Sequence, residues 1–264
     1  MEGIALRARI RRLIPSRIRR PLGRTTYRVL AGTSRVVPEV RSRMLHLLGG
    51  LPFLRMRDLV YDDRFFEEID AESDALYTEL VGAVMEMWAP RSVVDVGCGT
   101  GLMLAKLAER GVAVRGVEGS IAAIRRSRVG DRIVRADLER GVPRLGRFDL
   151  CLCIEVAEHL RPRSARRLVE GLAHLSDVVV FTAARPGQPG IAHLNPQPKS
   201  YWRSLFEAKG FASSPRDSEL IWAIQDVPEP EYIHANLMVF ERRVDAVDQD
   251  LRRKSAENPK TGSV

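Results

Sequence analysis

The stretch VVDVGCGTGLML at residues 93–104 decides the fold. Its first four residues are mostly β-branched and apolar, which is typical of a buried strand. Gly97, Gly99 and Gly101 follow, and they let the backbone turn tightly and approach a ligand closely. An apolar run begins at Leu102. A strand, a glycine-rich turn and a helix in this order predict a nucleotide-type cofactor site at the carboxyl end of a strand.

Strand-like and helix-like segments alternate after this stretch. Further strands are predicted at 112–117, 132–136, 148–154 and 178–184, and helices at 102–109, 121–126, 164–175 and 200–209. This alternation implies right-handed crossovers and a mostly parallel, doubly wound α/β sheet covered on both faces. NLMVFERR at 236–243 predicts a late strand, and the stretch before it, with Pro215, Pro228 and Pro230, is expected to be irregular.

The net charge of +8 is concentrated at the N-terminus. Residues 1–43 contain twelve arginines and two glutamates, a balance of +10, so the remaining residues sum to −2. We expect a basic arm with a short amphipathic helix over 1–50, a helical lead-in over 51–90, a catalytic domain over 91–243 and a disordered tail over 244–264. The arm could be solvated without a partner, or could bind an anionic membrane surface or lipid-linked substrate; nucleic acid is less favoured.

The cysteines and the hydropathy pattern indicate a compartment. Cys98, Cys151 and Cys153 are odd in number and favour neither a disulfide framework nor a zinc site, which fits a reducing cytoplasm. No apolar run reaches the roughly 18 residues of a membrane span, and arginines interrupt the N-terminus where a secretory signal would be apolar. We expect a cytoplasmic protein, either free or peripheral to the inner face of the membrane. A mitochondrial transit peptide is a less favoured alternative.

Acidic residues at three strand ends indicate the class of ligand. The dinucleotide pattern requires glycine at position 102, where this chain has leucine, and Asp95 lies two residues before the first glycine. A cationic ligand suits that carboxylate better than a pyrophosphate does. Glu118 follows the second strand, where it can accept two ribose hydroxyls, and Asp137 follows the third, placed to meet an adenine amine. A single acid at the end of a strand is common. The prediction therefore depends on all three acids together, one for each successive strand.

These residues resemble the class I S-adenosylmethionine-dependent methyltransferases, over roughly 91–242. The matching segments are DVGCGTG (95–101), VEGS (117–120), ADL (136–138) and FDLCLCIEVAEHL (148–160). The resemblance implies a Rossmann-like seven-stranded sheet whose last strand is antiparallel, with S-adenosyl-L-methionine as cofactor. It implies cofactor contacts from Asp95, Gly97, Cys98, Gly99, Gly101, Glu118, Gly119, Asp137, Leu138 and Glu155.

Two flanking segments carry a narrower resemblance. YDDRFFEEIDAES (61–73) and AHLNPQPKSYWRSLFEAKGF (192–211) are similar to a bacterial subgroup often associated with glycan or natural-product biosynthesis. The leading hypothesis is O-methylation of a sugar hydroxyl in a glycan, glycolipid or glycosylated metabolite. An RNA methyltransferase that uses the arginine-rich arm, a small-molecule natural-product O-methyltransferase and a non-catalytic binding module stay open.

The fourth strand-like run ends in IEVAEHL (154–160), where two acids and a histidine have the spacing i, i+3, i+4. If a helical turn begins at Glu155, then Glu158 and His159 point to the same side and the three can ligate Mg²⁺ or Zn²⁺. The same E-x-x-E-H pattern occurs in ubiquinone-biosynthesis O-methyltransferases and plant small-RNA 2′-O-methyltransferases. In those it helps to hold a divalent metal, and His193 would complete the set here.

Three roles for this cluster stay open. Glu155, Glu158, His159 and His193 can form a metal site. Alternatively His159 or His193 acts as a metal-free general base, with Glu158 as a further catalytic candidate, because a hydroxyl must lose its proton. The third role is structural, the start of a helix. In the following segment His193, Asn195 and Tyr201 are expected to face substrate, whereas core packing is favoured for Trp202.

Overall fold

The computed structural model describes residues 61, 63–188, 190, 193–227 and 231–243. The predictions of a basic arm at 1–50 and a disordered tail at 244–264 concern residues outside these ranges. No helix among the described residues combines the length and apolar character needed to cross a membrane.

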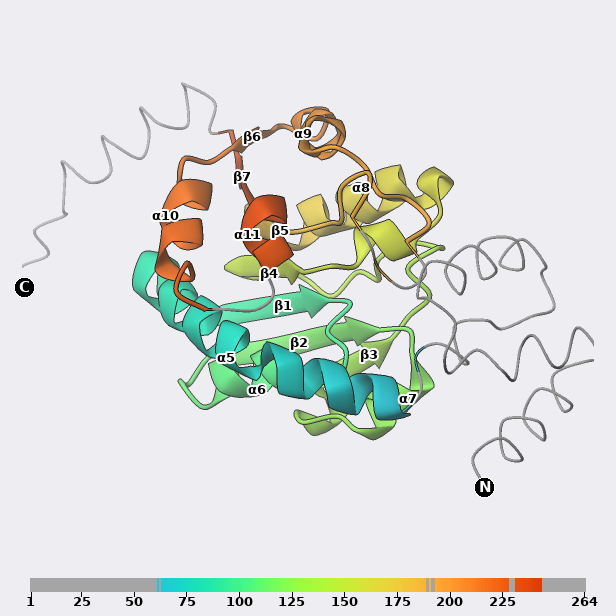
Figure 1. Ribbon diagram of the computed structural model, residues 1–264, viewed down its shortest axis with the longest axis vertical. Coiled ribbons are helices and arrows are strands. Elements are labelled where there is room, and N and C mark those ends of the chain that lie inside the picture. The colour runs from blue at the N-terminus through green and yellow to red at the C-terminus, as the bar shows by residue number, and fades with distance from the viewer. Residues whose placement is uncertain (1–60, 62, 189, 191–192, 228–230, 244–264) are drawn as a thin grey trace, which may run out of the picture.

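Seven strands form one sheet in the order β3-β2-β1-β4-β5-β7-β6 (Figure 1). They are β1 Ser92–Val96, β2 Ala113–Glu118, β3 Ile133–Arg135, β4 Leu150–Cys153, β5 Val178–Phe181, β6 Phe211–Ser213 and β7 Met238–Arg242. β1 to β5 are parallel, and β7 runs antiparallel to both of its neighbours, β5 and β6. The predicted doubly wound α/β class and the antiparallel last strand are confirmed.

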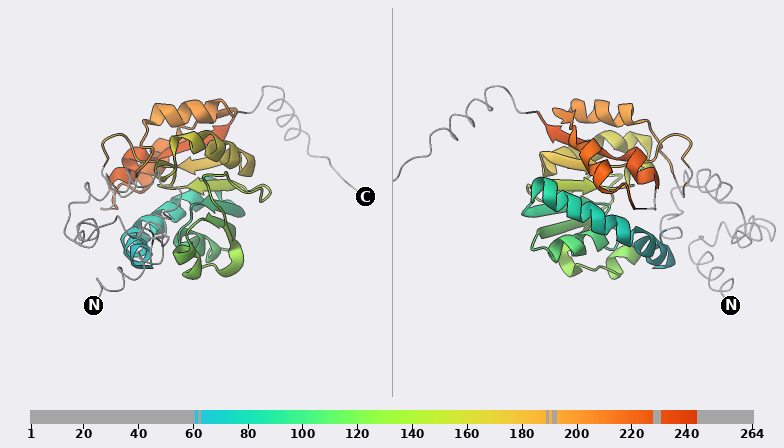
Figure 2. Two further views of the ribbon diagram at one scale, coloured as in Figure 1. Left: turned by 90° about the vertical axis from the view of Figure 1, so that its right-hand side faces the viewer. Right: turned by 60° about the vertical axis from the view of Figure 1, so that its left-hand side comes forward.

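Helices cover both faces of the sheet (Figures 1 and 2). They are α5 Asp63–Trp88, α6 Leu102–Ala108, α7 Ile121–Arg125, α8 Ala165–Leu175, α9 Lys199–Glu207, α10 Arg216–Ala223 and α11 Glu231–Asn236. α5, α6 and α10 share one apolar cluster with Val93, whereas α8 and α9 share the other with Val94. Successive residues of a strand point to opposite faces, so neighbouring valines of β1 enter different halves of the core.

The helical lead-in is long because its apolar stripe is continuous. Leu76, Leu80, Val81 and Val84 are buried on one side of α5, at helical spacing. The helix ends at Trp88, and Ala89 adopts a left-handed conformation with φ 42° before Pro90. α5 packs on α6, so the lead-in contacts the helix that follows the glycine turn.

The expectation of an irregular stretch before the last strand was wrong. Residues 211–236 contain β6, α10 and α11. β6 is three residues long and exists because it pairs with β7, where Phe211 joins the aromatic cluster of Phe206 and Phe240. Pro215 occupies the N-cap of α10, where the absence of an amide hydrogen costs nothing. These elements were not predicted because prolines stand where the helices start and because β6 lacks the alternation of apolar and polar residues that is typical of a strand.

Candidate active site

The glycine turn joins β1 to α6 at the carboxyl edge of the sheet. Gly97, Gly99 and Gly101 have φ values of 86°, 56° and 78°, a region that is unfavourable for residues with a Cβ atom. A Cβ at position 97 would also overlap the side chain of Val156, whereas one at position 99 would lie 3.6 Å from Phe66. The backbone of this turn therefore depends on glycine, and the first glycine additionally makes room for the residues after β4.

Glu118, the last residue of β2, connects this turn to the neighbouring strand. One carboxylate oxygen accepts a 2.9 Å hydrogen bond from the amide of Gly99. The other accepts from the amides of Gly119 and Ser120, both at 2.7 Å. The carboxylate predicted to meet a ribose thus lies directly beside the turn predicted to approach the cofactor.

Asp95 is a buried acid in the middle of β1. Its side chain is 4% exposed, and burial, followed by the negative charge of Glu118, raises its pKa to about 7. Among the described residues no lysine, arginine or histidine forms a salt bridge with it. A buried carboxylate in this position fits a positively charged ligand such as S-adenosylmethionine.

The other predicted cofactor residues lie at the same edge. Asp137 follows β3, and its Oδ1 accepts a 3.1 Å hydrogen bond from the amide of Glu139. Leu138 is buried. A Cβ at Gly119 would lie 3.2 Å from the carbonyl oxygen of Ala136, so this position is tight. Cys98, in the turn, is a half-buried free thiol whose pKa is raised by burial and by Asp95 and Glu118.

The turn after β4 begins later than the sequence spacing suggested. The 3₁₀ turn η3 covers Ala157–His159, and Glu155 stands before it in a left-handed conformation with φ 53°. The condition under which Glu155, Glu158 and His159 would share one helical turn is therefore not met. The amide of Glu155 donates a 2.8 Å hydrogen bond to Oγ1 of Thr182 after β5, which holds the strained backbone in place. Non-glycine residues in this conformation concentrate at functional sites.

Glu158 is completely buried and ties two loops together. Its backbone carbonyl accepts from the amides of Leu194 and Asn195, at 2.7 and 2.8 Å. Its Oε1 accepts a 3.2 Å bond from the amide of Ala184. Oε2 accepts from no N–H or hydroxyl donor of the described residues, and the carboxyl group lies within hydrogen-bonding reach of the carboxyl of Glu155. Burial, and then the negative charge of Glu155, raise the pKa of Glu158 well above its usual range.

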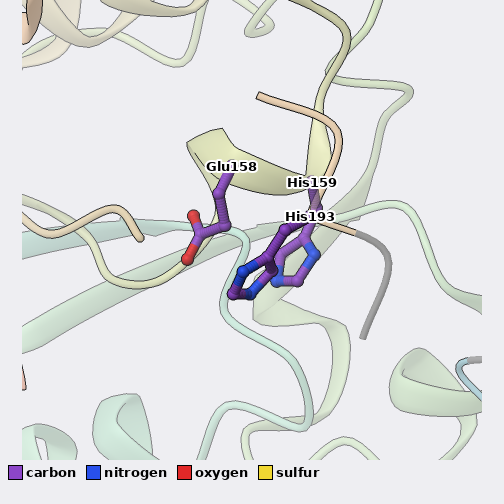
Figure 3. A group of neighbouring side chains, drawn as sticks. All are labelled: Glu158, His159 and His193. Carbon is purple, nitrogen blue, oxygen red and sulfur yellow. The ribbon is translucent and has the colours of Figure 1, made fainter. Parts of the chain in front are cut away.

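Glu158, His159 and His193 converge at this position (Figure 3). Each offers a ligand atom, and these atoms all lie within 4.8 Å of one another. The rings of His159 and His193 meet edge to face with centroids 5.2 Å apart. Nδ1 of His193 is buried without a partner, and burial lowers the pKa of this imidazole. Two buried acceptors without donors, beside a second imidazole, fit a divalent cation.

Glu155 lies outside this group although the sequence placed it among the metal ligands. Its Oε1 accepts a 3.1 Å hydrogen bond from Nδ2 of Asn236, the last residue of α11. Asn236 is fully buried and was not anticipated, because only the β5–β7 pairing brings it here. A sequence cue was available in its position as the first residue of the predicted late strand at 236–243.

The residues of 193–202 divide between site and core. Trp202 is fully buried against Phe181, with ring centroids 5.1 Å apart, which agrees with the expectation that it packs in the core. Tyr201 is half-buried beside it. Asn195 is buried, and its Oδ1 accepts from Nε2 of Gln197. Tyr61, which sequence reasoning did not single out, lies edge-on to His159 at 5.9 Å.

Residues 63–227 match the family model of a methyltransferase domain. The chain belongs to this methyltransferase family. It is an S-adenosylmethionine-dependent enzyme of class I, as its glycine turn and strand-end acids predicted. The match includes α5, so the helical lead-in is part of the family's domain.

Two curated relatives of this methyltransferase are ubiquinone biosynthesis O-methyltransferases. The protein of Alkalilimnicola ehrlichii is 30% identical over 128 residues, which is 45% of this chain and 48% of the relative. That of Pseudomonas paraeruginosa is 28% identical over 133 residues, 46% of this chain and 52% of the relative. The chain spans about half the length of these relatives.

Solved structures agree on the fold of this methyltransferase. Magnesium protoporphyrin IX methyltransferase from Synechocystis with bound SAM has a TM-score of 0.50 and 18% identity, over 78% of this chain and 97% of that one. The same enzyme with bound SAH has a TM-score of 0.50 and 17% identity, over 67% and 86% of the two chains.

Proposed function

We propose that this methyltransferase methylates a hydroxyl oxygen, and that the hydroxyl belongs to a sugar of a glycan, glycolipid or glycosylated metabolite. The convergence of Glu158, His159 and His193 carries the proposal. A hydroxyl must lose its proton as the methyl group arrives, and this cluster offers either a base or a metal site. The sugar assignment is supported by the narrower resemblance of residues 61–73 and 192–211.

The cofactor half of the site follows from the strand ends. S-adenosylmethionine supplies a methyl group on a positively charged sulfur. We assign Asp95 to balance the positive charge of the cofactor, Glu118 to the ribose hydroxyls and Asp137 to the adenine amine. The glycine turn, with Leu138 and Gly119, shapes the pocket around the adenosine. Alignment of donor and acceptor in such a site contributes about 7 to 11 kcal/mol.

The acceptor half contains the proton-accepting group. Without a metal, burial and the negative charge of Glu155 raise the pKa of Glu158 and favour its protonated form, which disfavours Glu158 as the base. His193 is kept neutral by burial and can accept a proton. A divalent cation such as Mg²⁺ or Zn²⁺ would be held by ionised Glu158 and by the imidazoles of His159 and His193, and it would supply a Lewis acid beside the hydroxyl.

Methyl transfer from labelled S-adenosylmethionine to cell fractions, followed by identification of the labelled product, tests the proposal. A methyl ether on a sugar is the expected product. A methyl group on nitrogen or carbon would overturn O-methylation. The same assay after removal of divalent ions by a chelator distinguishes the two forms of the cluster. Unchanged turnover assigns the base role to histidine, and loss that Mg²⁺ or Zn²⁺ restores assigns a metal site.

A second acceptor class is favoured by the curated relatives, which act in ubiquinone biosynthesis as O-methyltransferases. Tyr61, which lies edge-on to His159, and Phe65, whose ring centroid is 5.0 Å from that of Tyr61, offer aromatic edges that suit a phenolic ring. Turnover of a catechol, without turnover of glycosides, would establish this alternative. RNA methylation through the arm at 1–50 requires RNA affinity that falls steeply with salt and is lost when the arm is deleted.

A further inference from the structure

An open, cationic pocket adjoins the acceptor half of the site. Its volume is ≈ 660 Å³. It is lined by Arg185, Pro186, Gly187, Gln188, Pro198 and Lys199. The two charged residues of this lining are both positive. Lys199 is the first residue of α9, so the positive end of that helix dipole faces the same space.

Both cations are held by neutral groups. Nε of Arg185 donates a 3.2 Å hydrogen bond to Oδ1 of Asn236, and Nζ of Lys199 donates a 2.8 Å bond to the carbonyl oxygen of Leu237. Neither side chain forms a salt bridge within the described part of the chain. By contrast, Lys106, on the other face of the sheet, is 2.8 Å from Asp74.

Further positive charge surrounds these two cations. Burial lowers the pKa of Lys199; Asp217 opposes the shift, and the charges of Arg203 and Arg185 add to it. Nε of Arg203, one turn along α9, is buried without an acceptor. Three cations against the single acid Asp217 thus leave a local excess of positive charge, which a bound anion would neutralise.

Asn236 links this pocket to the proposed catalytic cluster. Its Nδ2 donates to Oε1 of Gln188 at 2.9 Å and to Oε1 of Glu155 at 3.1 Å. Gln188 also forms a backbone hydrogen bond with the ring of His193. Gln188 therefore belongs to the pocket lining and also contacts the cluster through His193. This contact puts the pocket on the side of the site where we propose that the acceptor binds.

We propose that Arg185 and Lys199 bind an oxyanion of the acceptor substrate, so that the methylated molecule carries a phosphate or a carboxylate in addition to its hydroxyl. The terminal amino groups of Arg185 present a fork that matches two oxygens, and Lys199 adds a point charge. This inference rests on the proposed function, because it names the substrate class of the same site. It predicts a preference for sugar phosphates or uronic acids over neutral sugars.

Binding of simple anions tests the pocket independently of catalysis. Inorganic phosphate and acetate are titrated by NMR against the full chain with S-adenosylmethionine bound, for wild type, Arg185→Gln, Lys199→Gln and Lys199→Arg. Arg166→Gln, which removes the same charge from an exposed position on α8, is the matched control. We expect about 10- to 100-fold weaker binding in the two glutamine variants, and near-normal binding in Lys199→Arg and the control. Equal binding in all five proteins would overturn the proposal.

Acceptor kinetics then distinguish the source of the anion. A methyl hexoside, its 6-phosphate and the corresponding uronate are compared as methyl acceptors. We expect a higher kcat/KM for one of the charged acceptors, lost in Lys199→Gln mainly through KM and rescued by Lys199→Arg. Equal use of the neutral hexoside would overturn the anionic class. If none of the three acceptors is methylated while phosphate binding still requires Arg185 and Lys199, the sugar hydroxyl would be rejected as the acceptor. The proposal of an anion-binding pocket would stand.

Discussion

The carboxyl edge of the sheet has two halves that are built differently. In the half formed by β1 to β3, Glu118 accepts hydrogen bonds from the backbone of Gly99, Gly119 and Ser120, all within 19 residues of it. In the half after β4 and β5, Glu158 contacts 184, 194 and 195, and Glu155 contacts Asn236, 81 residues away. The first half satisfies its acceptors locally. The second leaves Oε2 of Glu158 and Nδ1 of His193 without an N–H or hydroxyl partner, as a site for a reacting group would.

We infer from this difference that the β1–β3 half binds the cofactor and that the half after β4 and β5 carries out methyl transfer. The variant His193→Asn is the strongest test of this division. We expect methyl transfer to fall by about 10²- to 10⁴-fold, because the variant removes a base or a ligand. Affinity for S-adenosylmethionine, measured by calorimetry, should stay within about twofold, since the β1–β3 half is untouched. A parallel loss of cofactor affinity would show that the two halves are not independent.

Gly97→Ala tests the junction between the halves. The added methyl group overlaps Val156 at a φ of 86°, so we expect a loss of roughly 2 to 5 kcal/mol in the free energy of unfolding. Gly111→Ala is the matched control, because its φ is 82° and nothing lies within 4 Å of the added atom. Urea denaturation should show only about 1 to 2 kcal/mol for the control. Similar losses in both variants would mean that the side chain of Val156 moves aside without a cost in the free energy of unfolding.

Asp95 gives the cofactor half a pH dependence. Its pKa is about 7 in the folded protein against an ordinary 3.8, so between these values the folded state holds a proton that the unfolded chain has lost. Stability without cofactor should therefore decrease as pH rises through this window, by at most about 1.4 kcal/mol per unit.

Binding of the cationic cofactor favours ionised Asp95, so its affinity should rise about tenfold per unit up to pH 7 and then level off. Calorimetry across pH 5 to 8 measures this. Asp95→Asn should bind more weakly and lose the dependence; a variant with the wild-type profile would assign the titration to another group.

Ser120→Ala should have the smallest effect. Oγ of Ser120 accepts a 3.3 Å hydrogen bond from the amide of Ala123 and caps α7. Loss of such a cap costs about 0.5 to 2 kcal/mol, and we expect the low end because α7 is short. Urea denaturation of Ser120→Ala beside Ser120→Thr, which keeps the hydroxyl, measures it. A loss larger than that of Gly97→Ala would mean that the other local contacts of the β1–β3 half do not compensate for the missing cap.

Sequence reasoning succeeded where the chemistry lies in contiguous motifs. The strand, glycine turn and helix at 93–104 were identified, and so were the acids at or near the carboxyl ends of β1, β2 and β3, because parallel strands bring these ends to one edge. It failed for β6 and α10, which depend on packing against β7 and α5, and for α11. The helical spacing at 155–159 was misleading, since Glu155 leaves the turn through a left-handed conformation held by Thr182.

The sequence by itself determined the cofactor half of this methyltransferase. Glycine is required wherever φ is positive and a neighbour is close, and the order of strands in a doubly wound sheet sets which acids meet. Only the tertiary structure decided the acceptor half. The meeting of Glu158 with His193, which the resemblance had suggested, comes from the parallel pairing of β4 with β5. The anchoring of Glu155 by Asn236 and the cationic pocket of Arg185 and Lys199 arise from the long-range pairing of β5 with β7. Such contacts depend on how separate elements pack, and no local pattern encodes them.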